Sequence, residues 1–182
     1  ECLGMWVWSE TAFATREARQ KLVRFCVRHG ISHLDIQVHF TRDNGMPSVK
    51  DAEKIADLIA LAGQNNISTA ALRGSPQMFF ASNSGQTLEE LRAIVAFSRT
   101  LPGGNLFKGV KYDVEPYLTK EWKAKGESRK AVMLEYLSAL HKARTLLDEE
   151  APYLWLAVDM PFWWDKDEFV LEFEGNKKRF SE

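Results

Sequence analysis

The sequence predicts an α/β fold of the (β/α) barrel type, with about five strand-helix units in residues 1–182. Three observations support this prediction. Strand-like and helix-like segments alternate along the chain, which favours a parallel sheet with helical crossovers. Several strands have one aliphatic face and one face that becomes polar toward the C-terminal end. The 182 residues are fewer than the roughly 250 of a complete eight-stranded barrel, so we expect a single domain that is the N-terminal portion of a longer one.

The first unit is predicted from a short apolar run, residues 3–8, followed by a helix over residues 15–29. Thr15 stands where an N-cap residue is expected, and Gly30 where the helix should end. The first unit is therefore one strand and one helix.

The second strand is predicted over residues 31–40, and its two faces differ in polarity. Aliphatic residues occupy one face, whereas His33, Asp35, Gln37 and His39 share the other. A strand that helices cover on both faces should instead be apolar throughout. One face of this strand is therefore expected to line a polar interior.

Turn and capping signals separate the next elements. Residues 42–47 contain Asn-Gly and Pro and are predicted to form a loop. Ser48 with Asp51, and later Thr87 with Glu90, have capping-box spacing at the starts of two amphipathic helices. A third strand is predicted between these helices, over residues 67–72, and it ends at Arg73.

The fourth strand, residues 107–115, ends in Asp113-Val114-Glu115, and Pro116 stops its hydrogen-bond ladder. Lys111, Asp113 and Glu115 share one face of this strand. A long helix over residues 128–150, a fifth strand over 153–159 and a possible fifth helix over 176–182 follow.

The strand faces decide between two architectures. A doubly wound sheet should be apolar on both faces, whereas a barrel strand has one face toward the helices and one toward an interior that opens into the active site. The barrel is favoured, and an open five-stranded parallel sheet is the alternative. The residues expected to converge on one cavity are Trp6, Trp8, Asp35, Gln37, His39, Arg73, Lys111, Asp113, Glu115, Trp155 and Asp159.

Composition excludes several other classes of protein. The net charge is -1, so the chain lacks the basic surplus that would indicate nucleic-acid binding. No apolar run is long enough to span a bilayer. The two cysteines, Cys2 and Cys26, do not have metal-type spacing. Two buried thiols and one disulfide both remain open for this pair.

The Asp113-Val114-Glu115 segment resembles the D-x-E signature of (β/α) barrel glycoside hydrolases, such as chitinase-like family 18 and lysozyme-like family 25. This resemblance implies that Glu115 is the proton donor and that Asp113 orients the substrate or stabilises positive charge. Family 18 normally has another Asp where this chain has Lys111. Glu115-Pro116 is also similar to the Asn-Glu-Pro strand end of the large retaining-glycosidase clan, with Val114 in place of Asn.

The residue chemistry fits carbohydrate cleavage. An acid that is protonated near neutral pH is needed, and a second carboxylate together with apolar cover raises a carboxyl pKa, whereas Lys111 would lower it. Aromatic rings beside such a site can stack on sugars. With Tyr117, the aromatic candidates for substrate binding are Trp6, Trp8, Trp155, Phe162, Trp163 and Trp164.

We therefore expect a glycosidase that acts on a poly- or oligosaccharide outside the cytoplasm, without a metal or other cofactor. Closing the sheet would require the rest of the barrel or a second chain. One alternative is a metal-dependent barrel hydrolase or lyase that uses His39, Asp113, Glu115 and Asp159. Another is a carbohydrate-binding barrel that has no catalytic activity and needs the aromatic residues but not the acids.

Overall fold

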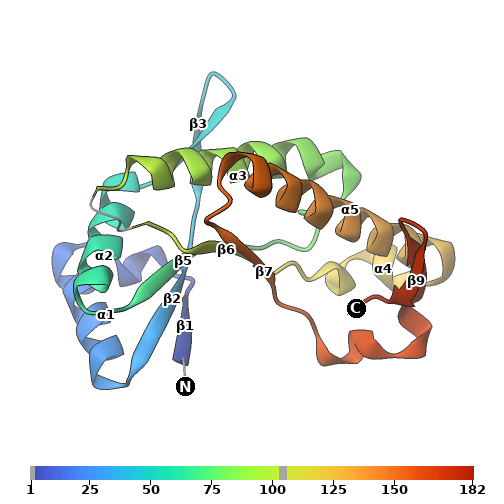
Figure 1. Ribbon diagram of the computed structural model, residues 1–182, viewed down its shortest axis with the longest axis horizontal. Helices are drawn as coiled ribbons and strands as arrows, with labels where there is room; N and C mark the ends of the chain where they lie inside the picture. Colours follow the sequence, from blue (N-terminus) through green and yellow to red (C-terminus); the bar gives the residue numbers. More distant parts are fainter. Residues whose placement is uncertain (1–2, 103–105) are drawn as a thin grey trace.

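A computed structural model describes residues 3–102 and 106–182, and its centre is a five-stranded parallel sheet. The order of the strands in space is β1-β2-β5-β6-β7, so each new strand of this sheet is added beside the previous one (Figure 1). Their bounds are β1 (Leu3–Val7), β2 (Ile31–Gln37), β5 (Ser68–Arg73), β6 (Gly109–Tyr112) and β7 (Trp155–Val158). The sheet is open, because its two outer strands, β1 and β7, are not paired with each other in the described residues.

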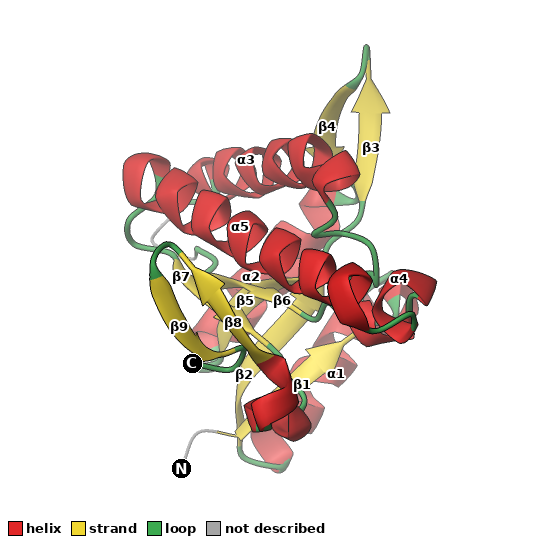
Figure 2. Ribbon diagram, turned by 90° about the vertical axis from the view of Figure 1, so that its right-hand side faces the viewer, coloured by secondary structure: helices red, strands yellow, loops and turns green. Residues whose placement is uncertain are grey.

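Helices connect the strands and lie along one side of the sheet (Figures 1 and 2). Their bounds are α1 (Arg16–Arg28), α2 (Ala52–Gln64), α3 (Ser84–Thr100), α4 (Lys120–Lys123) and α5 (Gly126–Glu150). Parallel crossovers are almost always right-handed, and here every crossover steps in the same direction across the sheet. Successive helices therefore fall on the same face. A doubly wound sheet would instead reverse its strand order and have helices on both faces.

The hydrophobic core lies between this face of the sheet and the helices. Leu34, Ile36 and Val110 point toward the helices and are fully buried, as are Leu58 and Leu91 on α2 and α3. Tight packing of such side chains is what fixes the strands against the helices. The strand residues of opposite parity point away from this core.

The sheet face without helices carries polar and aromatic side chains. Trp6 is 44% exposed and Trp155 is 38% exposed, although both belong to strands of the sheet. Asp35 lies on the same face as Trp6, because the two residues pair in register. Lys111 lies on the same face as Trp155, because Trp155 pairs with Gly109, which is two residues before Lys111 on β6. The two faces of the sheet are thus as different as the alternation of residues predicts.

Local signals explain where the first helix begins and ends. The Thr15 hydroxyl accepts a hydrogen bond from the Ala18 amide at 3.1 Å, as an N-cap residue does. Gly30 has a φ of +67°, the left-handed conformation that glycine adopts most easily after a helix. Cys26 is fully buried on α1, and burial raises the pKa of its thiol. Its possible disulfide partner, Cys2, lies outside the described residues.

The segment predicted as a loop over residues 42–47 is instead part of a β-hairpin. The strands β3 (Phe40–Asp43) and β4 (Met46–Val49) pair antiparallel and project away from the sheet (Figure 2). Asn44 and Gly45 have φ values of +48° and +83°, which suits the tight turn of a hairpin. The Asn-Gly signal marked the turn correctly, but the short flanking strands were missed.

The C-terminal residues also form a hairpin where a helix over 176–182 was expected, so that prediction is wrong. The strands β8 (Val170–Phe173) and β9 (Asn176–Arg179) are joined at Glu174 and Gly175, both with positive φ. The hairpin packs beside α5 (Figure 2), and Leu171 and Phe180 are buried there. Short 3-10 helices complete the fold: η1 (Glu10–Ala12), η2 (Ala81–Asn83), η3 (Pro116–Leu118), η4 (Phe162–Asp165) and η5 (Asp167–Phe169).

Neither predicted capping box forms. Asp51 precedes α2 in the left-handed conformation and makes no capping hydrogen bond, while Ser48 belongs to β4. Helix α3 begins before Thr87, whose hydroxyl donates to the carbonyl of Met78 at 2.8 Å. Thr87 and Glu90 instead contact residues outside α3, namely Met78 and Arg73, and sequence spacing alone does not distinguish such contacts from caps.

Candidate functional site

The C-terminal ends of β6 and β7 place acidic residues next to each other. Tyr112 pairs with Val158, so Asp113 and Asp159 are the next residues on two neighbouring strands. The Asp113 amide donates to the Arg73 carbonyl at 2.8 Å, and the Asp159 amide donates to the Tyr112 carbonyl at 2.9 Å. The backbone positions of both aspartates are thus fixed by the continuing ladder of the sheet.

The backbone of Asp113 also lies directly against Gly74. A Cβ atom at Gly74 would overlap the carbonyl oxygen of Asp113. Only glycine allows this close approach of the loop after β5. Gly74 therefore contributes to the site by letting the chain carrying Asp113 take its observed path.

Asp113 and Asp159 are both more easily protonated than ordinary aspartates. Burial raises the pKa of Asp113, and the negative charges of Glu115 and Asp159 raise it further. Burial also raises the pKa of Asp159, although the Lys111 ammonium group opposes this shift. The site therefore favours a bound proton at higher pH than an exposed aspartate would.

Glu115 has a different environment from Asp113. The Tyr117 hydroxyl donates a hydrogen bond to Oε1 of Glu115, across the turn that begins at Pro116. Burial and the neighbouring Glu115 carboxylate raise the pKa of Tyr117 to about 12. Tyr117 in turn packs edge-on against Trp163, with 5.3 Å between ring centroids. The carboxyl group of Glu115 is thus held by a tyrosine hydroxyl, whereas burial and neighbouring negative charge act on that of Asp113.

Lys111 connects the acids to the centre of the uncovered sheet face. Its Nζ lies 3.1 Å from Oδ1 of Asp159 and 3.2 Å from Oδ2 of Asp35. Asp35 is buried, and on its other side it meets His33 Nε2 at 2.8 Å. The expected convergence of Asp35, Lys111, Asp113 and Asp159 is therefore observed.

Exposed tryptophans flank this polar network. Trp6 presents its ring to Lys111 Nζ, 5.1 Å from the ring centroid, and it contacts Trp8, which is 40% exposed. Trp155 lies across Gly109, where any added Cβ atom would overlap the indole ring. These rings lie on the uncovered sheet face, so they are accessible for stacking.

Two residues predicted for substrate binding lie in other surroundings. Arg73 points to the helix side, where it pairs with Glu90 on α3 at 2.6 Å and lies over the Phe40 ring. Trp164 is fully buried among aromatic side chains that include Trp122 and Phe180. Arg73 alternates with the inward residues of β5, and Trp164 stabilises the core, so neither joins the carboxylate site.

Gln37 and His39 were predicted to share the polar face of the second strand, but only Gln37 belongs to β2. Gln37 is the last residue of β2 and half-buried. His39 lies beyond the end of β2, and its Nε2 is 3.8 Å from a carboxylate oxygen of Glu10. Because the strand ends at Gln37, the alternation no longer determines the direction of His39.

Three neighbouring residues extend the predicted site, and of these only Phe162 was among the aromatic candidates named from the sequence. His33 shares the polar face of β2 with Asp35, a signal that was visible in the sequence. Phe162, in the loop after β7, is 88% exposed, whereas its neighbours Trp163 and Trp164 pack inward. Tyr136 on α5 is buried, and burial, with the charges of Asp113 and Asp159, raises its pKa. Nothing in the sequence places this helix residue near the acids.

The described residues contain no group of three or more His, Cys, Asp or Glu side chains arranged to hold a metal ion. His39 in particular lies with Glu10 and not with the aspartates. In the described part of the chain, His39, Asp113, Glu115 and Asp159 are therefore not gathered around one point.

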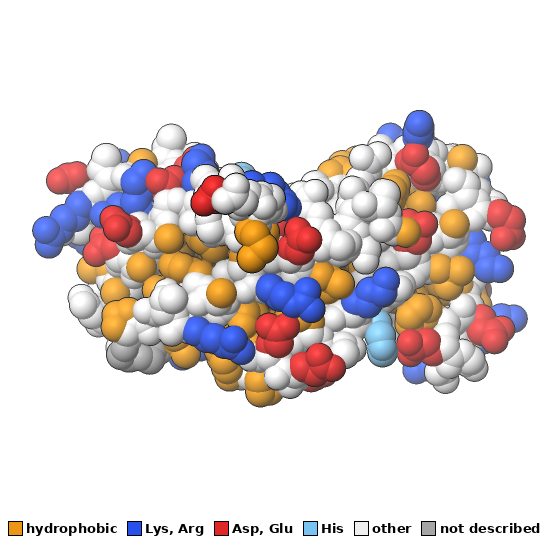
Figure 3. All heavy atoms as spheres, turned by 90° about the horizontal axis from the view of Figure 1, so that it is seen from above, with side chains coloured by type: hydrophobic (Ala, Val, Ile, Leu, Met, Phe, Trp, Pro, Cys, Tyr) orange, Lys and Arg blue, Asp and Glu red, His pale blue; other side chains and the backbone are white. Residues whose placement is uncertain are grey.

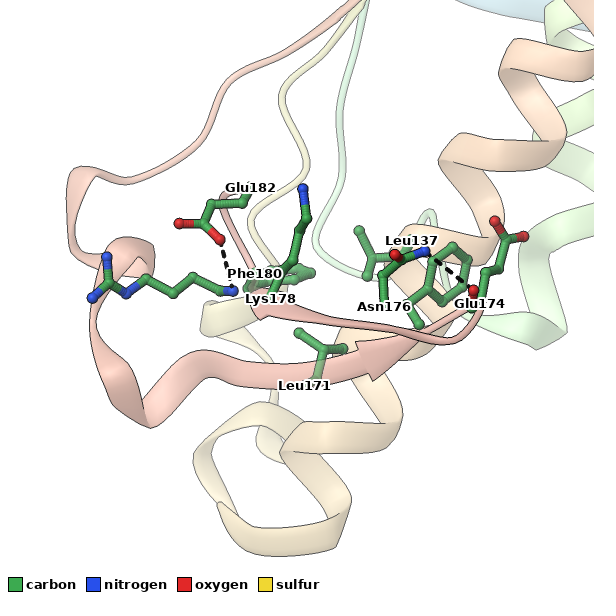
Figure 4. Close-up of a pocket in the computed structure, with 9 residues that line it drawn as sticks. Leu137, Leu171, Glu174, Asn176, Lys178, Phe180 and Glu182 are labelled. Atoms are coloured by element: carbon green, nitrogen blue, oxygen red, sulfur yellow. Dashed lines mark hydrogen bonds between the residues drawn. The ribbon is translucent and has the colours of Figure 1, made fainter.

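A separate pocket of about 320 Å³ lies between α5 and the β8-β9 hairpin (Figure 4). Leu137, Leu171 and Phe180 contribute its apolar lining. Two hydrogen bonds join polar residues of its lining: the Asn176 side-chain amide donates to the Glu174 carbonyl, and the Arg179 backbone amide donates to the Glu182 carboxylate. None of the carboxylate-site residues lines this pocket.

No model of a known protein family matches this chain. No curated protein matches the sequence either. Within residues 3–102 and 106–182, no helix has the length and apolar character needed to cross a membrane. The surface seen in Figure 3 mixes basic and acidic side chains instead of separating them into one broad patch.

Proposed function

We propose that this chain is a carbohydrate-active enzyme unit that cleaves glycosidic bonds by carboxylic acid catalysis. The observation that supports this proposal most directly is the pair of acids after β6. Asp113 has a raised pKa because of burial and neighbouring negative charge, while Glu115 accepts a hydrogen bond from Tyr117. Two carboxyl groups in unequal environments are the arrangement that acid and base catalysis requires.

The architecture supports the same proposal. Five parallel strands in consecutive order, with helices on one side, are the arrangement of successive units in a (β/α) barrel. We propose that the sheet belongs to such a barrel and that its uncovered face is the interior. Catalytic residues of barrel enzymes follow the C-terminal ends of strands, which is where Asp113, Glu115 and Asp159 stand.

The exposed tryptophans favour a sugar as substrate. Trp6, Trp8 and Trp155 present aromatic surface on the same sheet face as the polar network. Large exposed rings beside hydrogen-bonding groups suit pyranoses, which have apolar ring faces and polar edges. The substrate class is therefore a poly- or oligosaccharide, which we propose the protein meets outside the cytoplasm.

Replacing Glu115 by Gln tests the assigned chemistry, because it preserves shape and removes the acid. We expect turnover of a responsive oligosaccharide to fall by about 10²- to 10⁴-fold, with binding retained. Reducing-sugar release and calorimetry measure the two quantities on a panel of α- and β-linked oligosaccharides. Glu149→Gln, at an exposed position on α5, is the matched control and should leave both unchanged.

The outcomes separate three functions. Turnover that survives Glu115→Gln would refute the proposed acid. Sugar binding without turnover by the unaltered protein would instead indicate the carbohydrate-binding alternative. Activity that appears only after divalent metal is added would indicate the metal-dependent alternative.

A further inference from the structure

A chain of polar contacts crosses the uncovered face of the sheet and ends at the carboxylate site. Ser68 Oγ lies 2.7 Å from His33 Nδ1, and His33 Nε2 lies 2.8 Å from Asp35 Oδ1. Lys111 Nζ then joins Asp35 Oδ2 at 3.2 Å to Asp159 Oδ1 at 3.1 Å. Four strand segments, β5, β2, β6 and the end of β7, are therefore linked by side chains as well as by the backbone.

Lys111 is tightly held within this network. Its side chain is 19% exposed, and that of Asp35 is only 4% exposed. Asp35 is anchored by His33, and Trp6 lies against the ammonium group. Although burial alone would raise the pKa of Asp35, the hydrogen bonds from His33 and Lys111 bring this pKa below its ordinary value. Asp35 is thus a fixed negative charge that holds the lysine in place.

The lysine distinguishes the two aspartates of the site. Among the described residues, Lys111 pairs with Asp159 and Asp35 but makes no ion pair or hydrogen bond with Asp113. The second oxygen of Asp159, Oδ2, is buried and has no hydrogen-bond partner in the described part of the chain. Lys111 therefore favours the ionised form of Asp159, because its ammonium group opposes the rise in pKa that burial causes.

We propose that Lys111 is a positioning residue, which holds Asp159 in place in its ionised form so that the proton of the cluster resides on Asp113. The catalytic meaning of this inference rests on the proposed function, whereas the geometry does not. Asp113 faces Glu115 on its own strand segment, Lys111 on β6, Asp159 beyond β7 and Tyr136 on α5. The Lys111 charge also acts on Asp113, but without the direct contact that it makes with Asp159. Asp159 faces Lys111, Asp35, Asp113 and Tyr136.

Two carboxyl groups kept in different protonation states can perform different steps. A neutral Asp113 can donate a hydrogen bond or pass a proton to Glu115. An ionised Asp159 can stabilise the positive charge that develops on a sugar ring during cleavage. Without Lys111, both aspartates would compete for the same proton, because like charges at close range cannot both ionise easily.

Carboxyl NMR titration tests this inference on the purified full chain, labelled with ¹³C at aspartate carboxyl groups. In the unaltered protein we expect Asp113 to titrate at higher pH than Asp159. In Lys111→Met the Asp159 titration should move up by at least about one pH unit, as expected for the loss of an adjacent opposite charge. Lys111→Arg, which retains a cation, should restore the original order.

A second variant keeps the test decisive if Lys111→Met does not fold. Asp35→Asn leaves Lys111 in place but removes its competing carboxylate, so the Asp159 titration should move down in pH. The inference is overturned if Asp159 titrates above Asp113 in the unaltered protein. It is equally overturned if neither variant moves the Asp159 titration by more than about 0.3 pH unit, a small fraction of the shift an opposite charge produces.

The titration does not require turnover, so it distinguishes this inference from the proposed function. A protein that cleaves no oligosaccharide but shows the expected titrations would contradict the proposed function alone. Where turnover is found, the pH profile of kcat/KM should shift in Lys111→Met and return in Lys111→Arg. An unchanged profile in Lys111→Met would refute the positioning role.

Discussion

Replacing Trp164 by Ala should destabilise the protein severely, whereas replacing Phe162 by Ala should not. Trp164 is fully buried, and its ring lies 4.6 Å from Phe180 and 5.6 Å from both Trp122 and Tyr136, between centroids. Phe162 stands two residues earlier in the same 3-10 turn but is 88% exposed. The two positions therefore make a matched pair within one local structure.

The expected magnitudes follow from burial. Truncation of a buried tryptophan to alanine costs about 3–5 kcal/mol of unfolding free energy. For a chain of this size each kcal/mol lowers the Tm by roughly 2–4 °C, so the Tm should fall by roughly 6–20 °C. Phe162→Ala should change the unfolding free energy by no more than about 0.5 kcal/mol, as is usual for exposed positions.

Urea denaturation followed by circular dichroism measures both values without relying on tryptophan fluorescence. Similar dependence on urea in all three proteins would show that the comparison is between folded states of similar compactness. A loss below about 1 kcal/mol in Trp164→Ala, well under the range for buried aromatic residues, would refute the assignment of this ring to the core. A large loss in Phe162→Ala would equally contradict the exposed position of its ring.

Three further predictions concern the site. Gly109→Ala should lower the unfolding free energy by about 1–3 kcal/mol, because the added methyl group overlaps the Trp155 ring. Adding Trp155→Ala should recover part of this loss in urea denaturation. Equal stability of the single and double variants would contradict the packing of Trp155 over Gly109. Gly74→Ala, which overlaps the Asp113 carbonyl oxygen, should lower stability more than Gly85→Ala, where no atom lies near the added Cβ, and equal Tm values would be inconsistent with the close approach. Asp113→Asn should gain stability relative to the unaltered protein as pH rises. Because the folded-state pKa of Asp113 is raised, the native state binds the proton more tightly than the unfolded chain, so the unaltered protein loses stability between the ordinary aspartate pKa and the raised one. Denaturation at acidic and neutral pH measures this difference, and a gain that is largest in acid would reverse the sign and refute it.

The alternation of strand residues predicted much of the site. Asp35 and Lys111 lie on the strand face assigned to them, and they meet Asp159 because parallel strands bring their C-terminal ends to the same edge. The Asp113-Val114-Glu115 segment follows β6 directly. These features depend on a two-residue repeat and on strand order, both of which are written in the chain.

Arg73 shows where the same reasoning stops. The third strand has small or apolar residues at both parities, so its sequence does not indicate which face meets the helices. Pairing of Arg73 with Tyr112 puts it on the helix side, where Glu90 compensates its charge. The direction of this side chain was decided by the register with β6 and by a partner on α3.

The sequence by itself determined the alternating strands and helices, the polar face of the sheet and the acids at the end of the fourth sheet strand. These properties arise from local periodicity, which needs no knowledge of distant residues. Only the tertiary structure decided that Trp164 is buried while Phe162 is exposed, and that the C-terminal residues pair as a hairpin. Both outcomes depend on packing against α5 and its neighbours, because burial is a property of contacts between segments far apart in the chain.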